Sequence, residues 1–153
     1  NGTDEALALQ GTIAVANAKV AYRRYQDLFE GDEFAELAAR GGRPQRPLWA
    51  STGTKNPEYS DVLYVVELVG PNTVNTVPPA TLDAFRDHGE VRGDTVLEGV
   101  DDAIESIDAL GDLGIDFDDI TATLQVEGVQ AFIDAFDRLL EAIDDKAARL
   151  AAG

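Results

Sequence analysis

The fold is decided by RPLWASTGTKNPEYSDVLYVVELVGPNTVNT, the stretch from Arg46 to Thr76. Residues 48–51 are apolar on both strand faces and are bounded by proline and glycine, which indicates a strand covered on both sides. Residues 73–77 are rich in β-forming side chains and predict a second short strand. Between them lie a polar loop and a short apolar helix that Ser60-Asp61 would cap. Two strands joined through a helix form a βα repeat, so this stretch predicts a parallel pair with helices outside it.

The residues before this stretch predict helices. One long helix is expected to run from near the start of the chain to about Phe29, with apolar side chains recurring at helical spacing. The main apolar positions are Leu9, Ile13, Ala16 and Val20. A second, short helix is expected over residues 33–40, and Gly41-Gly42 should close it.

The residues after the two strands also predict helices. Pro79 suits the first turn of a helix that should end near His88, and residues 90–99 indicate an irregular connection. Three further helices follow without any strand signal between them, and the last is the most amphipathic segment of the chain. They are expected to begin near Val100, Phe117 and Val129. The alanine-rich tail from Asp144 is expected to fray.

Composition excludes several classes of partner and site. The chain has 153 residues and a net charge of −17, which argues against nucleic acids and anionic membranes as partners. It contains no cysteine, so disulfides and thiolate metal sites are excluded. One histidine among scattered carboxylates does not predict a metal site. The start of the chain shows no signal-peptide pattern, and we expect a cytoplasmic protein that binds no cofactor.

Positive charge is concentrated in one part of this acidic sequence. No Asp or Glu occurs between Glu36 and Glu58, although the chain holds 29 acidic residues. Four of its 12 basic residues lie in that interval, namely Arg40, Arg43, Arg46 and Lys55. Such an island suits an anionic ligand such as a phosphate. The alternative, that these side chains only pair with nearby acidic helices, stays open.

Ser51 and Lys55 are the strongest candidates for a ligand site. Ser51 ends the first predicted strand, and Lys55 lies in the loop that follows it. In α/β barrels, active sites are built at the carboxyl ends of strands and from the loops after them. The loop offers hydroxyl groups, backbone amides around Gly53 and one ammonium group, which together can hold a phosphate. The spacing of a P-loop is absent.

Three segments resemble transaldolase in its long bacterial form. Residues 46–89, which contain WASTGTKNPEYSD, resemble the last two barrel strands of that family. The preceding GTIAVANAKVAYRRYQ is similar to the helix that leads into this region. The segment IDFDDITATLQVEGVQAFIDAFDRLLEAI is similar to the closing helices of the family.

The resemblance implies an α/β fold of a particular kind. The chain would be the C-terminal portion of a (β/α)8 TIM-type barrel, with its last two parallel strands and several flanking and closing helices. All of residues 1–153 would then belong to a single barrel domain. Residues 1–45 would be helices leading into the barrel strand, residues 46–89 two βα units, and residues 90–153 the closing helices.

The resemblance also implies a metal-independent transaldolase of the pentose phosphate pathway. Such enzymes transfer a dihydroxyacetone unit between sugar phosphates through a Schiff base on a lysine. By position, Ser51 and Lys55 match the family's phosphate-binding serine and the basic residue after the seventh strand. Many relatives have an arginine there, with a shorter loop. A lysine holds phosphate as a point charge and lacks the bidentate fork of arginine.

The catalytic groups of the family belong to earlier strands, which we expect this chain to lack. Lys19 and Lys146 lie in predicted helices and Lys55 lies in a loop, so none of them qualifies as a desolvated nucleophile. We therefore expect a C-terminal fragment that supplies the phosphate-binding side and is inactive alone. A partial barrel exposes strand edges, which predicts self-association or pairing with the missing N-terminal part.

Other interpretations stay open from the residues alone. The acidic amphipathic helices at the end of the chain also fit a non-enzymatic interaction module, which would bind no sugar phosphate. Part of another class I aldolase, or of a bifunctional fusion, would share the same strand pattern.

Overall fold

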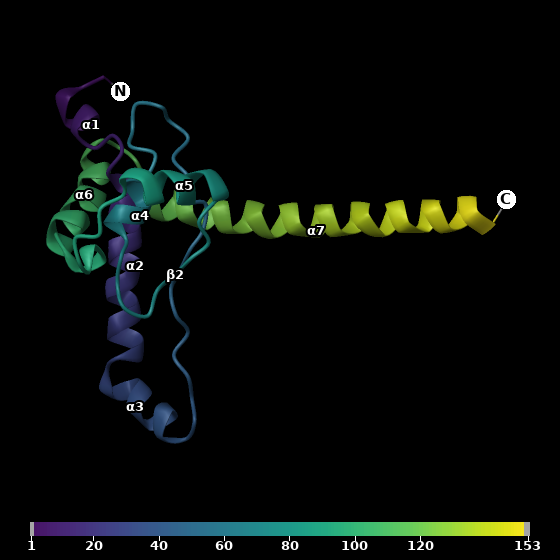
Figure 1. Cartoon of the computed structure of the whole chain (residues 1–153), viewed down its shortest axis with the longest axis horizontal. Helices are drawn as coiled ribbons and strands as arrows, with labels where there is room; N and C mark the ends of the chain where they lie inside the picture. Colours follow the sequence, from purple (N-terminus) through teal and green to yellow (C-terminus); the bar gives the residue numbers. More distant parts are fainter. Residues whose placement is uncertain (1, 152–153) are drawn as a thin grey trace. The chain divides into compact units, whose positions relative to one another are not determined.

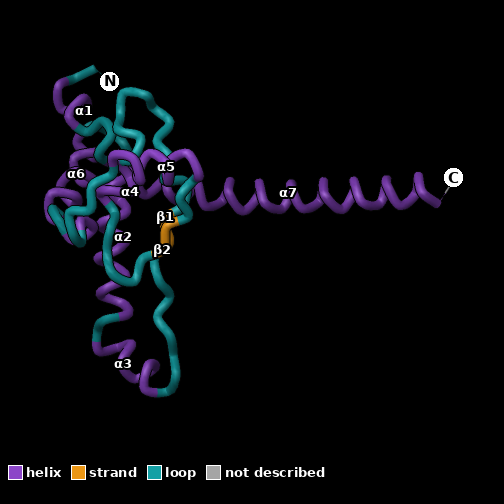
Figure 2. Tube along the Cα trace, in the orientation of Figure 1, coloured by secondary structure: helices purple, strands orange, loops and turns teal. Residues whose placement is uncertain are grey.

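The computed structural model describes residues 2–151, which form two units that divide after Leu113. The first unit contains six α-helices, one 3-10 helix and two short parallel strands (Figures 1 and 2). The second unit is a single helix with the short turn before it. The described part of the chain is therefore mostly helical with one parallel strand pair.

The first helical region is broken in two, so the prediction of one long helix is wrong. Helix α1 spans Asp4–Ala8 and α2 spans Ile13–Phe29. Between them Gly11 has a φ of +78°, a left-handed conformation that ends a right-handed helix. The buried face of α2 is consequently rotated from the predicted one: Ala16 is buried as expected, but Ile13 and Val20 are only partly buried. The buried residues of α2 are Val15, Ala16, Lys19, Tyr22 and Tyr25.

Helix α3, Asp32–Ala39, ends as the sequence predicts. Gly41 has a φ of +91°, and its amide donates to the carbonyl of Ala38 at 2.9 Å. The amide of Gly42 donates to the carbonyl of Leu37 at 2.8 Å. This is the Schellman arrangement, in which two otherwise unpaired carbonyls of the last turn are satisfied.

The predicted parallel pair is confirmed, although both strands are shorter than expected. Strand β1 is Leu48–Trp49 and β2 is Val74–Asn75, with Leu48 opposite Val74 and Trp49 opposite Asn75. Leu48 is 53% exposed. The expectation that the first strand is covered on both faces is therefore wrong for the described residues, which leave about half of Leu48 exposed.

Two short helices follow the strands. Helix α4 spans Leu63–Glu67, so it begins later than the predicted cap at Ser60-Asp61. The Ser60 hydroxyl still accepts from the amide of Val62 at 3.4 Å. Helix α5 spans Pro79–His88, with Pro79 in its first turn as predicted.

The core of the first unit is formed on α2. Its buried cluster joins residues of α2 to Leu68, which follows α4, and to Val96. A row of aromatic rings extends this cluster along α2 and into α3. The distances between successive ring centroids are 5.6 Å from Tyr22 to Tyr25, 5.5 Å from Tyr25 to Phe29 and 5.0 Å from Phe29 to Phe34. Helix α6, Val100–Asp112, packs along α2 (Figure 1).

The predicted irregular connection over residues 90–99 contains two fully buried residues. The 3-10 helix η1 spans Thr95–Leu97, and both Thr95 and Val96 have 0% exposure. The Thr95 hydroxyl donates to the carbonyl of Val66 at 2.7 Å. A Cβ on Gly70 would lie 2.2 Å from the side chain of Val96, so only glycine allows this close approach. The connection is thus part of the core.

The second unit differs from the prediction of two helices after α6. Helix α7 runs without a break over Phe117–Ala151. Gly128 lies at the predicted junction, but one glycine in a helix interior costs only about 1 kcal/mol. The tail from Asp144 is helical to Ala151, and residues 152–153 lie outside the described residues. Among residues 2–151, no helix combines the length and the apolarity needed to cross a membrane.

The exposed apolar side chains of α7 predict that the chain self-associates. Seven of them recur at helical spacing along one side, and the described part of the second unit contains no other helix or strand that could cover them. They are Val129, Phe132, Ile133, Phe136, Leu139, Leu140 and Ile143. Phe132→Glu should raise the dissociation constant roughly tenfold or more, because burying a phenylalanine contributes about 1.5–3 kcal/mol. Sedimentation velocity measures the shift toward monomer.

Ala131→Glu is the control for this experiment, since it adds the same charge on the polar side of α7 and should leave association unchanged. A wild-type chain that remains monomeric at high concentration would contradict the prediction.

His88 links the end of α5 to the segment before α4. It lies in the last turn, as predicted, and its Nε2 is 2.9 Å from Oδ1 of Asp61. Its Nδ1 is 3.2 Å from Oδ2 of Asp87. Hydrogen bonding to Asp61, and then to Asp87, raises the pKa of His88 above its ordinary value of 6.5.

This raised pKa predicts a pH-dependent difference between the wild type and His88→Gln. The stabilising effect of protonated His88 should be fully present below about pH 6.5 and be lost as the pH rises through its pKa in the folded protein. The wild type should therefore have the higher Tm at pH 6 and lose that advantage by pH 9. The effect should be small, because both carboxylates are exposed. A difference in Tm that stays constant with pH would contradict this assignment.

Candidate functional site

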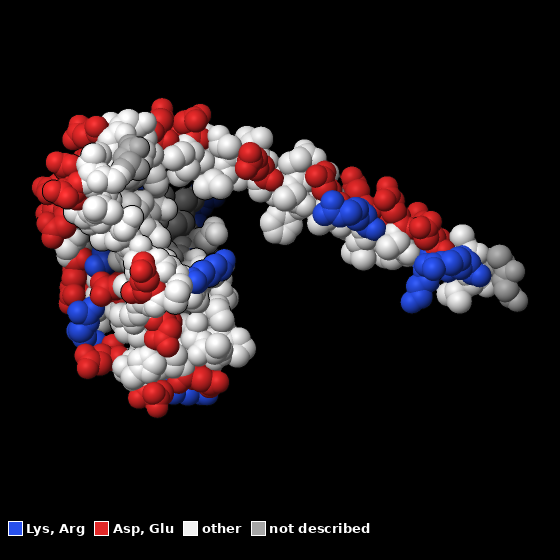
Figure 3. Space-filling model, turned by 90° about the horizontal axis from the view of Figure 1, so that it is seen from above, with Lys and Arg blue, Asp and Glu red and all other residues white. Residues whose placement is uncertain are grey.

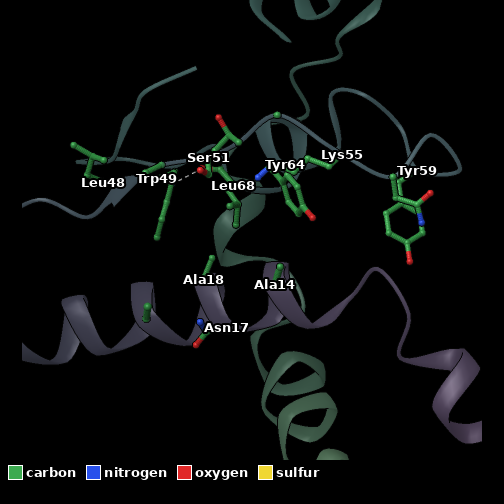
Figure 4. Close-up of a pocket in the computed structure, with 15 residues that line it drawn as sticks. Ala14, Asn17, Ala18, Leu48, Trp49, Ser51, Lys55, Tyr59, Tyr64 and Leu68 are labelled. Atoms are coloured by element: carbon green, nitrogen blue, oxygen red, sulfur yellow. Dashed lines mark hydrogen bonds between the residues drawn. The ribbon is translucent and has the colours of Figure 1, made fainter. Parts of the chain in front are cut away.

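A cavity of about 610 Å³ lies beside the carboxyl end of β1, within the first unit (Figure 4). Its lining comes from β1, the loop after it, α4 and the first half of α2. The structure brings both predicted site residues, Ser51 and Lys55, to this one cavity. Small side chains of α2, such as Ala14 and Ala18, leave the space open on the opposite side.

Ser51 has an unusual backbone conformation. Its φ is +55°, one of two positive values at non-glycine residues within the described chain. A residue with a side chain costs roughly 1–3 kcal/mol in the left-handed region and remains there only where its surroundings hold it. Ser51 is exposed, so its hydroxyl is available to a ligand in the cavity.

Hydrogen bonds to β2 hold the chain on both sides of Ser51. Before it, the carbonyl of Trp49 accepts from the Thr76 amide at 3.0 Å and from the Thr76 hydroxyl at 3.2 Å. After it, the Thr52 hydroxyl donates to Oδ1 of Asn75 at 2.8 Å. Thr52 is 3% exposed, so this bond is protected from water. A net hydrogen bond contributes about 0.5–1.5 kcal/mol, which means that several are needed to offset the strain at Ser51.

Trp49, which lines the cavity, is hydrogen-bonded to the core residue Leu68. Trp49 donates from Nε1 to the carbonyl of Leu68 at 3.1 Å, the bond drawn as a dashed line in Figure 4. Gly53 lies close to α5, where an added Cβ would be 3.2 Å from the Thr81 hydroxyl and 3.3 Å from Pro78. The loop therefore starts close to α5, and a side chain at Gly53 would require its neighbours to move by a few tenths of an ångström.

Lys55 lies in the exposed part of the loop. The loop is closed by the Thr54 hydroxyl, which donates to the carbonyl of Ser60 at 2.8 Å. Among the described residues, no carboxylate lies within ion-pair distance of Lys55. Figure 3 shows several groups of acidic side chains on the surface in that view, with basic side chains in a few small patches. An ammonium group beside the cavity can attract an anion there.

The three arginines of the positive island do not reach this cavity. Arg40, Arg43 and Arg46 precede β1, at the opposite end from Ser51, and none of them lines the cavity. All three are exposed. Of the four bases noted in the sequence, only Lys55 contributes to the candidate site.

The sequence did not predict a group of ion pairs centred on Glu67, in which only Lys19 is buried. Lys19 on α2 is 8% exposed; its Nζ lies 3.5 Å from Oε2 of Glu67 and donates to the carbonyl of Glu98 at 2.9 Å. Arg92 binds the other oxygen of Glu67 at 2.6 Å. The burial of Lys19 could have been predicted from the sequence, because Lys19 lies one turn from Val15 and from Tyr22 on the apolar face of α2. None of these groups lines the cavity beside β1.

The described residues contain no group of three His, Asp or Glu side chains placed to hold a metal ion. What the cavity can offer a ligand is a hydroxyl group, an ammonium group and an aromatic wall that includes Trp49 and Tyr64. This arrangement can bind an anionic group at the cavity mouth without a metal.

Comparison with known proteins identifies the family. Residues 2–143 match the transaldolase/fructose-6-phosphate aldolase family. The chain is 54% identical over 141 residues to the transaldolase of Mycolicibacterium smegmatis, covering 92% of this chain and 38% of that protein. It is 49% identical over 148 residues to the transaldolase of Frankia alni, covering 97% of this chain and 40% of that protein. The chain thus spans about two-fifths of the length of these curated relatives, and it belongs to the transaldolase/fructose-6-phosphate aldolase family.

Proposed function

We propose that this chain is the C-terminal part of a (β/α)8 barrel transaldolase and supplies the side of the active site that binds the substrate phosphate. In this proposal β1 and β2 are the last two barrel strands, residues 1–45 lead into them, residues 46–89 form two βα units and residues 90–153 close the barrel. The observation that carries the proposal is the parallel pairing of β1 with β2, which puts Ser51 and Lys55 beside one cavity at the carboxyl end of β1.

The reaction is the transfer of a dihydroxyacetone unit between sugar phosphates. A lysine amine attacks the donor ketone, and the resulting iminium accepts electrons as the carbon–carbon bond breaks. Ser51 and Lys55 take no part in bond cleavage. Their role is to hold the phosphate, the hydroxyl by a hydrogen bond and the ammonium by charge, so that the donor sugar lies in one orientation.

None of the three lysines of this chain suits the role of the Schiff-base nucleophile. Lys19 is buried but is paired with Glu67 and with the carbonyl of Glu98, and it does not line the cavity. Lys55 and Lys146 are exposed, so neither lies in the desolvated pocket that activates a Schiff-base lysine. We infer that the nucleophile and the acid/base carboxylates are supplied by a part of the enzyme outside residues 1–153, and that the protein acts in the cytoplasm.

Trapping with borohydride tests the proposed function. The 153-residue chain alone should form no adduct when incubated with fructose 6-phosphate and borohydride, because it lacks a suitable lysine. A chimera in which this chain replaces the matching 141 residues of the Mycolicibacterium smegmatis transaldolase should form the adduct and transfer the three-carbon unit. Mass spectrometry detects the adduct, and a coupled assay measures transfer.

The parent enzyme is the positive control, and circular dichroism reports whether the chimera folds. A chimera that folds without forming the adduct would reject the proposal. An adduct on the isolated chain would reject the assignment of the nucleophile to another part of the enzyme.

Phosphate binding tests the assignment of Lys55. Lys55→Ala should weaken the binding of inorganic phosphate to the chain by roughly two- to fivefold, since an exposed charge pair contributes about 0.5–1 kcal/mol. Titration followed by NMR gives the dissociation constant. Lys146→Ala removes an equally exposed lysine from α7 and should change nothing. Equal affinities for the wild type and Lys55→Ala would show that the phosphate site is elsewhere.

A further inference from the structure

We propose that Asn75 is a positioning residue that acts through Thr52 to hold Ser51 in its left-handed conformation. The proposal concerns the backbone of Ser51, and its consequence for ligand binding rests on the proposed function. From the sequence, Thr52 was only one of the loop hydroxyls that could hold a phosphate, and Asn75 was not singled out.

Asn75 on β2 lies within reach of the turn that follows β1. Asn75 is opposite Trp49 in the parallel register, and Thr52 lies only three residues beyond Trp49. The chain must turn sharply within Ala50, Ser51 and Thr52 for the Thr52 hydroxyl to return to Asn75 at 2.8 Å. The φ of +55° at Ser51 makes that turn.

The burial of Thr52 makes the bond to Asn75 hard to replace. With 3% exposure, the Thr52 hydroxyl cannot exchange its partner for bulk water. An extended Ser51 would carry Thr52 away from Asn75 and leave a buried hydroxyl unpaired. The cost of that unpaired group opposes the relaxation of Ser51, so the strained conformation persists.

Contacts on both sides restrict the turn that contains Ser51. The carbonyl of Trp49 is held by Thr76 before the turn, and Gly53 is held close to Thr81 after it. The contacts with Thr76 and Asn75 therefore restrict the backbone conformation of Ser51 before a ligand binds. Such preorganisation reduces the entropy that binding must overcome.

Substitutions of Thr52 in the full 153-residue chain test this proposal. Thr52→Val keeps the shape of the side chain and removes the hydroxyl, and Asn75→Ala removes the acceptor. Both should shift the Ser51 Cα and Cβ NMR signals and its amide–Hα coupling away from left-handed values. Both should also weaken the binding of inorganic phosphate by roughly two- to fivefold, as expected for the loss of one exposed polar contact. Thr52→Ser keeps the hydroxyl and should restore both properties.

Thr73→Val is the matched control. It removes another hydroxyl bond, from Thr73 to the carbonyl of Gly70 at 2.7 Å, at the opposite end of β2. It should affect stability without moving the Ser51 signals. If Thr52→Val unfolds the chain, Asn75→Ala gives the same test from the less buried partner.

Ser51 signals that stay left-handed in Thr52→Val and in Asn75→Ala would overturn the proposal. Failure of the proposed function is distinguishable from this result. If no variant, including Lys55→Ala, changes phosphate binding while the Ser51 signals move in Thr52→Val, the positioning role holds and the phosphate site is rejected.

Discussion

Two backbone hydrogen bonds between β1 and β2 determine the geometry of the site. The Val74 amide donates to the carbonyl of Pro47 at 2.9 Å, and the Thr76 amide donates to the carbonyl of Trp49 at 3.0 Å. They place Asn75 where its side chain can accept from Thr52. A shift of one residue would turn Asn75 to the opposite face of the pair, because side chains alternate along a strand. The turn after β1 would then lose its anchor.

A parallel pair of two-residue strands is too short to be stable alone, so other contacts must fix this register. The Tyr22 hydroxyl donates to the carbonyl of Pro71, just before β2, at 3.0 Å. Trp49 is bonded through its indole nitrogen to Leu68. Burial raises the pKa of Tyr22, and the neutral hydroxyl is the donor that this contact requires. The site therefore depends on the helical core around α2 more than on the strands.

Local signals in the sequence predicted the elements whose formation is local. Pro79 at a helix start and Gly41-Gly42 at a helix end act through the backbone conformation of a few neighbouring residues, and both are confirmed. Two other predictions were wrong: the helix expected to run through Gly11 is broken there, and the two helices expected on either side of Gly128 form one continuous helix, α7. The same residue type ends one helix and is tolerated in another, because the outcome depends on the surrounding helix propensity and packing. The burial of Thr95 and Val96 could not be predicted, since it arises from contacts with residues far away in the sequence.

In the candidate site, too, the sequence predicted which residues take part but not their geometry. Sequence alone selected Ser51 and Lys55, because polar residues that follow a strand lie at its carboxyl end. It could not supply the strain at Ser51, which exists only because β2 offers partners on both sides of the turn. Lys55 carries no comparable constraint: it is exposed on a long loop, and a point charge tolerates many positions. In the proposed site, the restricted backbone of Ser51 would contribute geometry, and Lys55 would contribute charge. This arrangement explains how a lysine can serve where a rigid bidentate group is not required.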